Sequence, residues 1–362
     1  MLNKYFMVIV FLVLYVLYKT LHKSEHFSEN NNKLKLSRPW VNLYDNNGNI
    51  LNVALLSRPF FQSNDEEDFK NKIVGKFNIL GISSYQEFPN QPYNPADGYN
   101  KTTNQYNYNK WINMCKGWLH CFRNPDDYLP KNMKRILLSE SDFIDCQIHK
   151  ENKEVEKKYD FMYICHRDNL NDCSVDEWVA YNKNLVLAEK CFKILCKKKK
   201  LKGILVGREG CKIPTCTDAN IHTTKKLEYY DLLKKYDECK IIFIPNIHDA
   251  SPRVLCESLA HNLRCLVNKN LVGGWKYVNK NTGEFFNDEN DFEEKIDKII
   301  ANYDSYTPRK YFVENYGIKN TGKKLKEFVY SIFKDKVNIP KEKVEYITPE
   351  FPKEKWISCE VN

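Results

Sequence analysis

Two carboxylates in the last third of the chain have a spacing that could serve a reaction. Asp249 and Glu257 are separated by seven residues in the stretch NIHDASPRVLCESLAHNLRCLV, residues 246–267. This pattern predicts a loop, a helix and a buried strand. Ser251 is a favourable N-cap residue and Pro252 a favourable first helical residue, so the helix is expected to begin there. Asp249 then lies in the loop before the helix, and Glu257 lies within the helix.

The residues on either side of this stretch indicate where it lies in a sheet. KIIFIP, residues 240–245, predicts a strand that brings the chain to the carboxyl edge of a parallel sheet, where open α/β folds bind ligands. After the next strand, Gly273 and Gly274 predict a turn whose backbone N–H groups could approach a phosphate. The plainer alternatives are a loop acid near a helix N-terminus, a surface helix residue and a turn of no further function.

Strands and helices alternate cleanly in the second half of the chain. YDFMYIC (159–165), KGILVG (202–207) and RCLVN (264–268) are short apolar runs with helical segments between them. This alternation predicts a parallel sheet with helices on both faces. In the first half, NVALLS (52–57) and FNILGIS (77–83) predict buried strands of a second α/β region.

The N-terminus contains an uncharged apolar segment, Tyr5–Tyr18. It is shorter than the roughly 20 residues that cross a bilayer comfortably, and no small-residue cleavage site follows it, so we expect an uncleaved membrane anchor. Basic residues are more frequent after the segment than before it, which predicts that the bulk of the chain is cytosolic. A glycosylation sequon at Asn100 supports the alternative, the lumen of the secretory pathway.

The cysteines predict thiols and no metal site. The chain has 13 cysteines and no Cys-x-x-Cys pair, and a zinc framework usually needs closer pairs. Buried thiols behave as small apolar side chains, so a reducing compartment is the simplest inference. The cysteines within apolar runs are Cys165, Cys191, Cys196, Cys256 and Cys265.

Length and charge limit the classes of function. The 362 residues are enough for two domains, and 42% hydrophobic residues can form their cores. The net charge of +9 is compatible with nucleic acid, anionic membrane or phosphate-bearing small molecules. The basic residues are spread along the chain and not interleaved with aromatics, which argues against nucleic acid as a partner. The Asn-, Lys- and Ile-rich composition is typical of an AT-rich genome, such as that of a protist or a large DNA virus.

The order of strand, loop acid, SPRVLCESLAHNLRCLV, Gly-Gly and YVNKNTGEFF resembles the donor-binding half of retaining nucleotide-sugar glycosyltransferases of the GT-B fold. This large group (glycosyltransferase family 4-like, group 1) includes sucrose synthase and many lipopolysaccharide mannosyltransferases. Its signature is two glutamates separated by seven residues, whereas this chain has Asp249 and Glu257 at these positions. The resemblance covers about residues 159–333.

The resemblance implies an α/β fold of GT-B type, in which two Rossmann-like domains face a cleft, here preceded by the N-terminal hydrophobic anchor. We expect an anchor over 1–24, an acceptor-side α/β domain over 25–155, a nucleotide-sugar-binding domain over 156–335 and a tail over 336–362. The family also often presents a histidine of the first domain to the donor sugar, and His120 is the candidate.

The resemblance also implies roles for individual residues. Asp249 would contact the donor sugar or stabilise positive charge that develops on it, and Glu257 would accept hydrogen bonds from the ribose hydroxyls. A family arginine and lysine clamp the diphosphate, and Arg167 and Lys183 are the candidates, with Arg208 as a substitute for either. The other donor-binding candidates are Ser251, Arg253, Gly273 and Gly274. A plainer alternative for Arg253 is contact with solvent or a neighbouring carboxylate.

The predicted function is that of a metal-independent, retaining, hexosyltransferase-like enzyme of glycan biosynthesis. It would use no cofactor and would move a sugar from a nucleotide sugar to a glycan, lipid or protein acceptor. The chain has no Asp-x-Asp pair to hold a metal ion. One alternative is a non-catalytic, GT-B-like binding or scaffold protein at a membrane. Another is a basic membrane protein that binds anionic lipid or nucleic acid.

Overall fold

A computed structural model of the chain describes residues 35–60, 62, 64–90, 108–169, 173–213, 215–217 and 219–349. The predicted anchor over 1–24 and the sequon at Asn100 lie outside these residues. Among the described residues, no helix is long and apolar enough to cross a membrane.

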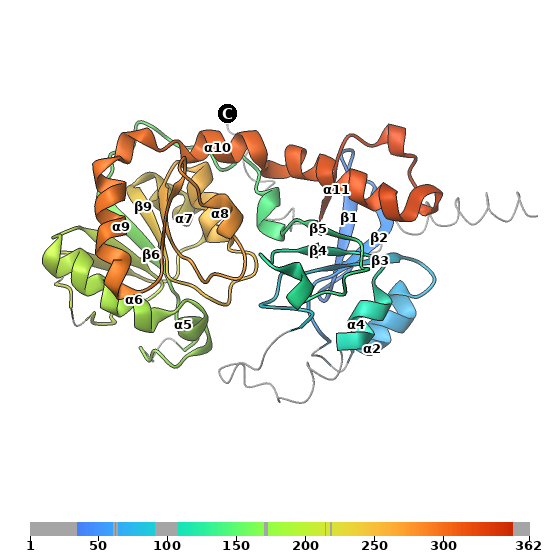
Figure 1. Cartoon of the computed structure of the whole chain (residues 1–362), viewed down its shortest axis with the longest axis horizontal. Coiled ribbons are helices and arrows are strands. Elements are labelled where there is room, and N and C mark those ends of the chain that lie inside the picture. Colours follow the sequence, from blue (N-terminus) through green and yellow to red (C-terminus); the bar gives the residue numbers. More distant parts are fainter. Residues whose placement is uncertain are drawn as a thin grey trace, which may run out of the picture.

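The described chain forms two six-stranded sheets, each flanked by helices (Figure 1). The first sheet has the order β12-β1-β2-β3-β4-β5, in which β1 is antiparallel to both neighbours and the pairs from β2 to β5 are parallel. Its strands are β1 (Trp40–Asp45), β2 (Ile50–Leu56), β3 (Asn78–Ile82), β4 (Trp118–His120), β5 (Arg135–Leu137) and β12 (Ile347–Pro349). Helices α2 (Asp65–Asp68) and α4 (Tyr108–Met114) lie beside it.

The second sheet is entirely parallel, in the order β11-β10-β9-β6-β7-β8. Its strands are β6 (Tyr159–Ile164), β7 (Gly203–Val206), β8 (Ile221–Thr224), β9 (Cys239–Ile244), β10 (Arg264–Asn268) and β11 (Gly283–Phe286). The helices that follow or separate them are α5 (Trp178–Asn182), α6 (Leu185–Phe192), α7 (Tyr229–Asp237), α8 (Arg253–Ala260), α9 (Glu289–Ala301) and α10 (Pro308–Asn315).

Alternate side chains of the second sheet fill two separate cores. Phe161 and Tyr163 of β6 pack in one core with α6 and α9, whereas Met162 packs in the other with α7 and α8. Successive residues of a strand point to opposite faces, so a strand buried on both faces must be apolar throughout. The two α/β regions and the parallel character of the second sheet are therefore as the sequence predicted.

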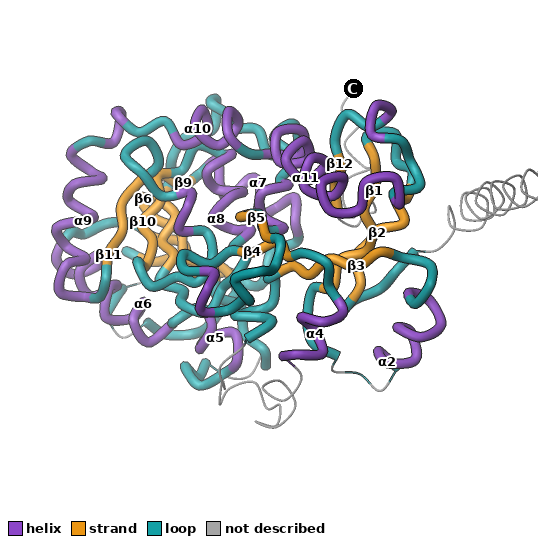
Figure 2. Tube along the Cα trace, turned by 45° about the vertical axis from the view of Figure 1, so that its right-hand side comes forward, coloured by secondary structure: helices purple, strands orange, loops and turns teal. Residues whose placement is uncertain are grey.

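The last long helix, α11 (Gly317–Phe333), returns to the first sheet. Its buried side chains Leu325, Val329 and Phe333 pack with Leu43 and Val53 of β1 and β2. Figure 2 shows α11 beside β1 and β12. The expected boundaries assign this helix to the second domain and leave residues 336–362 as a tail. In the structure its apolar face covers the first sheet, and β12 extends that sheet by pairing with β1.

One buried carboxylate joins the two sheets and α11. Asp142 lies in a short 3₁₀ helix, Glu140–Phe143, and is fully buried. Its carboxylate accepts hydrogen bonds from the backbone N–H of Ser139 (2.8 Å), the ammonium of Lys276 and the hydroxyl of Tyr277. Its carbonyl oxygen accepts a hydrogen bond from the hydroxyl of Thr321 in α11 (2.9 Å). Asp142 thus connects three parts of the chain, which are its own 3₁₀ helix, the segment of Lys276 and Tyr277, and α11.

We expect Asp142→Ala to lower the free energy of unfolding by about 3–5 kcal/mol, because it leaves the buried ammonium of Lys276 without a counter-charge. Urea denaturation measures this change. The exposed Asp304 is a matched control, and Asp304→Ala should stay within about 0.5 kcal/mol of the parent chain. Equal effects of the two substitutions would contradict this assignment.

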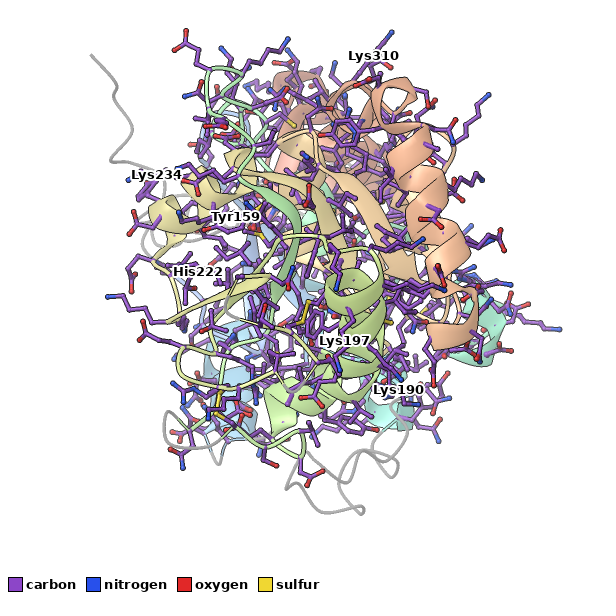
Figure 3. All side chains as sticks on the ribbon, turned by 90° about the vertical axis from the view of Figure 1, so that its left-hand side faces the viewer. Tyr159, Lys190, Lys197, His222, Lys234 and Lys310 are labelled. Carbon is purple, nitrogen blue, oxygen red and sulfur yellow. A yellow bond between two sulfur atoms is a disulfide. The ribbon has the colours of Figure 1, made fainter. Side chains whose placement is uncertain are left out.

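The structure contains two disulfides, whereas the sequence analysis expected only free thiols. Cys173 is bonded to Cys211, and Cys196 to Cys216, while the cysteines on the inner strands stay reduced and buried. Figure 3 draws such bonds in yellow, and it also shows Lys234 and Lys310 far from the neighbouring Lys190 and Lys197. Cys196 was expected as a free thiol because its neighbours are apolar, but its partner is 20 residues further along the chain.

Alkylation of the denatured protein should therefore depend on prior reduction. Two disulfides hold four sulfur atoms, so mass spectrometry should find four more alkyl groups after reduction than before it. Equal labelling with and without reduction would show that both disulfides are absent from the folded protein.

Candidate functional site

Asp249 lies at the carboxyl edge of the second sheet, in the loop between β9 and α8. Its Oδ2 is 2.9 Å from Nζ of Lys183, which directly follows α5, and 3.2 Å from Nδ2 of Asn246. Its Oδ1 accepts a hydrogen bond from the backbone N–H of Ser251 (3.2 Å). Lys183, between α5 and α6, and Asp249, after β9, are 66 positions apart in the chain, and the fold brings them together at this edge.

Asp249 and Lys183 line a cavity of about 430 Å³ between the two domains. The second domain contributes these two residues together with Ser251, Arg253 and Val254, and the opposite wall comes from the first domain. That opposite wall consists of Arg38, Ser57, Arg58, Ser84, Tyr85 and Glu140. Four cationic side chains and two carboxylates therefore face one cavity, and the excess of positive charge favours an anionic ligand.

The arginines of the cavity are held by carboxylates. Arg58 pairs with Asp65 (2.8 Å), and Arg38 pairs with Glu140 (2.8 Å). Arg253 reaches the same Glu140 across the cleft (3.3 Å), as the plainer interpretation of this residue expected. Burial raises the pKa of Glu140, but Arg38 and Arg253 outweigh this and lower its pKa below the ordinary value. Glu140 therefore stays ionised and fixes the two arginines at the cavity.

The structure places the start of α8 one residue later than predicted. The helix begins at Arg253, its N-cap position is Pro252, and no side chain caps it. The hydroxyl of Ser251 instead accepts a hydrogen bond from the backbone N–H of Ser141 (2.9 Å) and lies 2.8 Å from the hydroxyl of that residue. The prediction that Ser251 caps the helix was wrong, because its side chain hydrogen-bonds to Ser141 of the other domain instead.

The two glycines pack against the Asp249 loop. The backbone N–H of Gly273 donates to the carbonyl oxygen of Asp249 (3.0 Å), and a Cβ at this position would lie 1.8 Å from the carbonyl oxygen of Ala250. Gly274 has a φ of +83°, and a Cβ there would lie 2.4 Å from Cγ of Pro252. Only glycine fits at such approaches. The N–H group of Gly273 is therefore engaged in positioning the Asp249 loop, so in this structure it is not available to a phosphate.

Besides the two glycines, three of the predicted donor-binding or catalytic residues do not line the cavity. Arg208 is buried and donates to the carbonyl oxygen of Ser174 (2.8 Å) and to Glu177 (3.3 Å), which makes it a structural residue of the second domain. Glu257 is 7% exposed and accepts a hydrogen bond from the hydroxyl of Tyr236 (2.8 Å). Arg167 follows β6, and its buried Nε makes no hydrogen bond within the described residues.

The sequence analysis did not predict the residues of the first domain that line this cavity. Arg58 directly follows the predicted strand 52–57, and this position was a usable signal because β2 ends at the cleft. Arg38 and Glu140 carried no comparable signal, since they are 102 positions apart in the chain and only the folding of the first domain brings them together. Among the described residues, no group of three or more His, Cys, Asp or Glu side chains could hold a metal ion.

His120 ends β4 and is buried, and its Nδ1 makes no hydrogen bond within the described residues. Burial, followed by the charges of Arg135 and Lys276, lowers its pKa to about 4. It does not line the cavity of Asp249. His120 is therefore neutral at pH 7, and its side chain packs parallel to the ring of Phe122, 6.2 Å between ring centres.

A histidine with a lowered pKa makes stability depend on pH. The folded state binds a proton less readily than the unfolded state, so the contribution of His120 is complete above about pH 6.5 and is lost as the pH falls toward 4. Urea denaturation should give a free energy of unfolding that decreases over this range. The decrease should be smaller in His120→Gln, by up to about 1.4 kcal/mol per pH unit.

The exposed His222 is the matched control, and His222→Gln should leave the pH dependence as it is. If His120→Gln retains the full decrease between pH 6.5 and 4, other groups cause it and the burial argument for His120 is wrong.

Comparisons with known proteins identify the fold. No family model and no curated protein matches the sequence. Among solved structures, TarM has a TM-score of 0.51 at 14% identity over 71% of this chain and 51% of that chain. A glycosyltransferase from Rickettsia africae ESF-5 has a TM-score of 0.52 at 15% identity over 78% of this chain and 77% of that chain. The pneumococcal O-GlcNAc transferase GtfA, solved with UDP and GlcNAc, has a TM-score of 0.51 at 11% identity over 75% and 55%.

These likenesses show that the chain has the fold of the GT-B glycosyltransferases, as predicted. The chain spans about half the length of TarM and GtfA. At these identities the likeness establishes the arrangement of the two domains around a cleft.

Proposed function

We propose that the protein is a glycosyltransferase that moves a sugar from a nucleotide-sugar donor to an acceptor with retention of configuration. The observation that carries this proposal is the ion pair of Asp249 and Lys183 in a cationic cavity between the two domains of a GT-B fold. Fold alone does not establish a reaction, and the proposal therefore depends on the chemistry of these residues.

The cations of the cavity are suited to a diphosphate. Lys183 and Arg253 come from the second domain, and Arg38 and Arg58 face them from the first. Negative charge builds on the distal phosphate as the bond to the sugar breaks, and fixed cations lower the energy of that transition state. A guanidinium can donate two parallel hydrogen bonds to phosphate oxygens, which would also orient the leaving group.

Arg167 is a further candidate for contact with the donor phosphates. Its backbone N–H donates to the carbonyl oxygen of Gly207 (3.2 Å), which holds the residue at the carboxyl edge of the sheet. A buried donor without a partner is unusual in a folded protein, and its Nε is such a donor. An anionic ligand that enters from the cleft would satisfy it.

Asp249 would stabilise the positive charge that develops on the reacting carbon of the sugar, as carboxylates do in other reactions at this carbon. The side chain is one methylene shorter than the glutamate usual at this position. Its hydrogen bonds from Asn246 and Ser251 hold the carboxylate in one orientation. The backbone bond from Gly273 fixes the loop that carries it.

Asp249→Asn and Lys183→Ala should separate catalysis from donor binding. We expect Lys183→Ala to weaken binding of UDP- or GDP-sugars roughly 10- to 100-fold, because it removes a charged hydrogen bond to phosphate. Asp249→Asn should leave the dissociation constant within about fivefold and lower the rate of sugar transfer or donor hydrolysis by about 100-fold or more. Calorimetry measures binding, and release of UDP or GDP measures turnover.

Lys310→Ala, at an exposed position of α10 that lines neither this cavity nor its surroundings, is the control for loss of surface charge. Unchanged turnover in Asp249→Asn would rule out the catalytic role of this residue. The anomeric configuration of the product, read by NMR, tests retention independently.

A non-catalytic GT-B-like binding or scaffold protein is the second candidate, and one observation favours it. Glu257 is buried and its Oε2 already accepts a hydrogen bond from Tyr236, so little of its carboxylate is accessible to a ribose. A protein that binds nucleotide sugars but neither transfers nor hydrolyses them under any condition would match this second candidate. A protein that binds no nucleotide sugar would match neither.

A glycan, lipid or protein could serve as acceptor, and an N-terminal anchor would keep the enzyme at a membrane. The flanking lysines favour a cytosolic catalytic part, whereas the two disulfides favour the lumen of the secretory pathway, because disulfides persist in oxidising compartments.

A further inference from the structure

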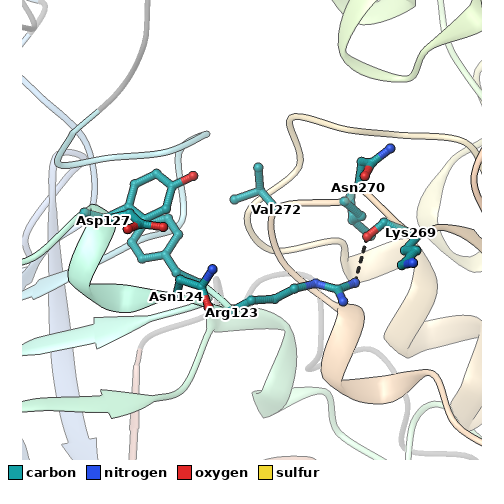
Figure 4. A pocket seen from close by; sticks show the side chains of 9 residues that line it. Arg123, Asn124, Asp127, Lys269, Asn270 and Val272 are labelled. Carbon is teal, nitrogen blue, oxygen red and sulfur yellow. Dashed lines mark hydrogen bonds between the residues drawn. The ribbon is translucent and has the colours of Figure 1, made fainter.

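A second cavity, of about 380 Å³, lies between the loop that follows β4 and the loop that follows β10 (Figure 4). It shares no lining residue with the cavity of Asp249. The two cavities nevertheless border one loop. Ala250, which stands between Asp249 and Ser251, packs against Phe122 and Val272 of the second cavity. This second cavity therefore lies beside the proposed reaction site and between the same two domains.

Four polar side chains of the second cavity are exposed and accessible to a ligand. Asn124 and Asp127 belong to the first domain, and Lys269 and Asn270 belong to the second. Figure 4 shows the two pairs on opposite sides of the cavity. Within the described residues, none of these four side chains makes a hydrogen bond or an ion pair. Together they offer a carboxylate acceptor, an ammonium donor and two amides that can both donate and accept.

An aromatic wall completes the cavity. The rings of Tyr128 and Phe122 are stacked, with 3.9 Å between their centres and 8° between their planes. Phe122 is buried, and Tyr128 is half-buried at the cavity. This stack holds the ring of Tyr128 as a rigid apolar surface among hydrogen-bonding groups, and rigid aromatic groups cost little conformational entropy when a ligand binds.

Arg123 connects the two walls. Its guanidinium donates to the carbonyl oxygen of Lys269 (2.7 Å) and lies 5.2 Å from the ring centres of both Trp275 and Phe285. Figure 4 shows this side chain reaching from one domain to the other. The charge of Arg123 is thus engaged with the protein, so the charges available to a ligand are one carboxylate and one ammonium.

We propose that this cavity binds a neutral pyranose unit of the acceptor glycan, an inference that rests on the proposed function. Balanced charge, amides and one aromatic face match the hydroxyls and the apolar face of a sugar ring. The volume falls within the range of small-ligand sites. A diphosphate fits this cavity poorly because Asp127 would repel it, whereas the cationic cavity at Asp249 accepts it. A glycan that contacts both walls would also stabilise the present arrangement of the domains.

The test is binding of a panel of disaccharides to the whole chain, followed by saturation-transfer NMR and calorimetry. Maltose, cellobiose, lactose, chitobiose and mannobiose present different pyranoses. For the disaccharide that binds best, Tyr128→Ala and Asn124→Ala should each weaken binding by roughly fivefold. Tyr128→Phe, which keeps the ring, should bind as the parent does. Lys310→Ala is the surface control, and thermal unfolding confirms that each variant is folded.

UDP binding, measured on the same variants, separates this inference from the proposed function. We expect Tyr128→Ala and Asn124→Ala to bind UDP as the parent does. If UDP binds but no disaccharide does, the inference is wrong and the glycosyltransferase proposal stands. If a disaccharide binds and the exposed Asn124→Ala variant leaves its affinity unchanged, the site lies elsewhere and the inference is also wrong. Disaccharide binding lost in both variants, without any nucleotide binding, supports the site and contradicts the proposed function.

Discussion

The buried carboxylate of Asp142 is the constraint on which the arrangement of the two domains depends. It binds Lys276 and Tyr277 of the second domain, while its backbone holds Thr321 of α11. A buried carboxylate is costly unless its partners are all in place, so these contacts form together or not at all. Asp142 follows Ser141 and Glu140, which reach Ser251 and Arg253 across the cleft. The geometry of the cavity therefore follows from one short segment between the domains.

The proposed chemistry depends on positions that the cleft brings together from both domains. Lys183 and Asp249 meet at the edge of one sheet, and Arg38 and Arg58 face them from the other. The loop of Asp249 also separates two kinds of environment. One side has the charge excess suited to a diphosphate, and the other has the balanced polar groups and aromatic wall of the second cavity. The proposed reaction, between an anionic donor and a neutral acceptor, would make use of this difference.

Much of the second domain could be predicted because its signals are local. Apolar runs such as Tyr159–Ile164 are strands buried on both faces, and the alternation with helices leaves few topologies. The strand β8 (Ile221–Thr224) escaped this reasoning because IHTT is short and mostly polar, and only pairing with β7 makes it a strand. The cysteine pairs escaped it too, since no spacing along the chain specifies which sulfur atoms meet.

The sequence by itself determined the parallel sheet of the second domain and the place of Asp249 before a helix at a sheet edge, because periodicity and turn residues act over short distances; the GT-B architecture came from the resemblance to a known family. Only the tertiary structure decided the role of each side chain. Ser251 hydrogen-bonds to Ser141 instead of capping its own helix, and Arg208 hydrogen-bonds to Glu177. Arg58 lines the cavity. A side chain bonds to whatever partner folding brings within about 3 Å, and that partner can come from any part of the chain.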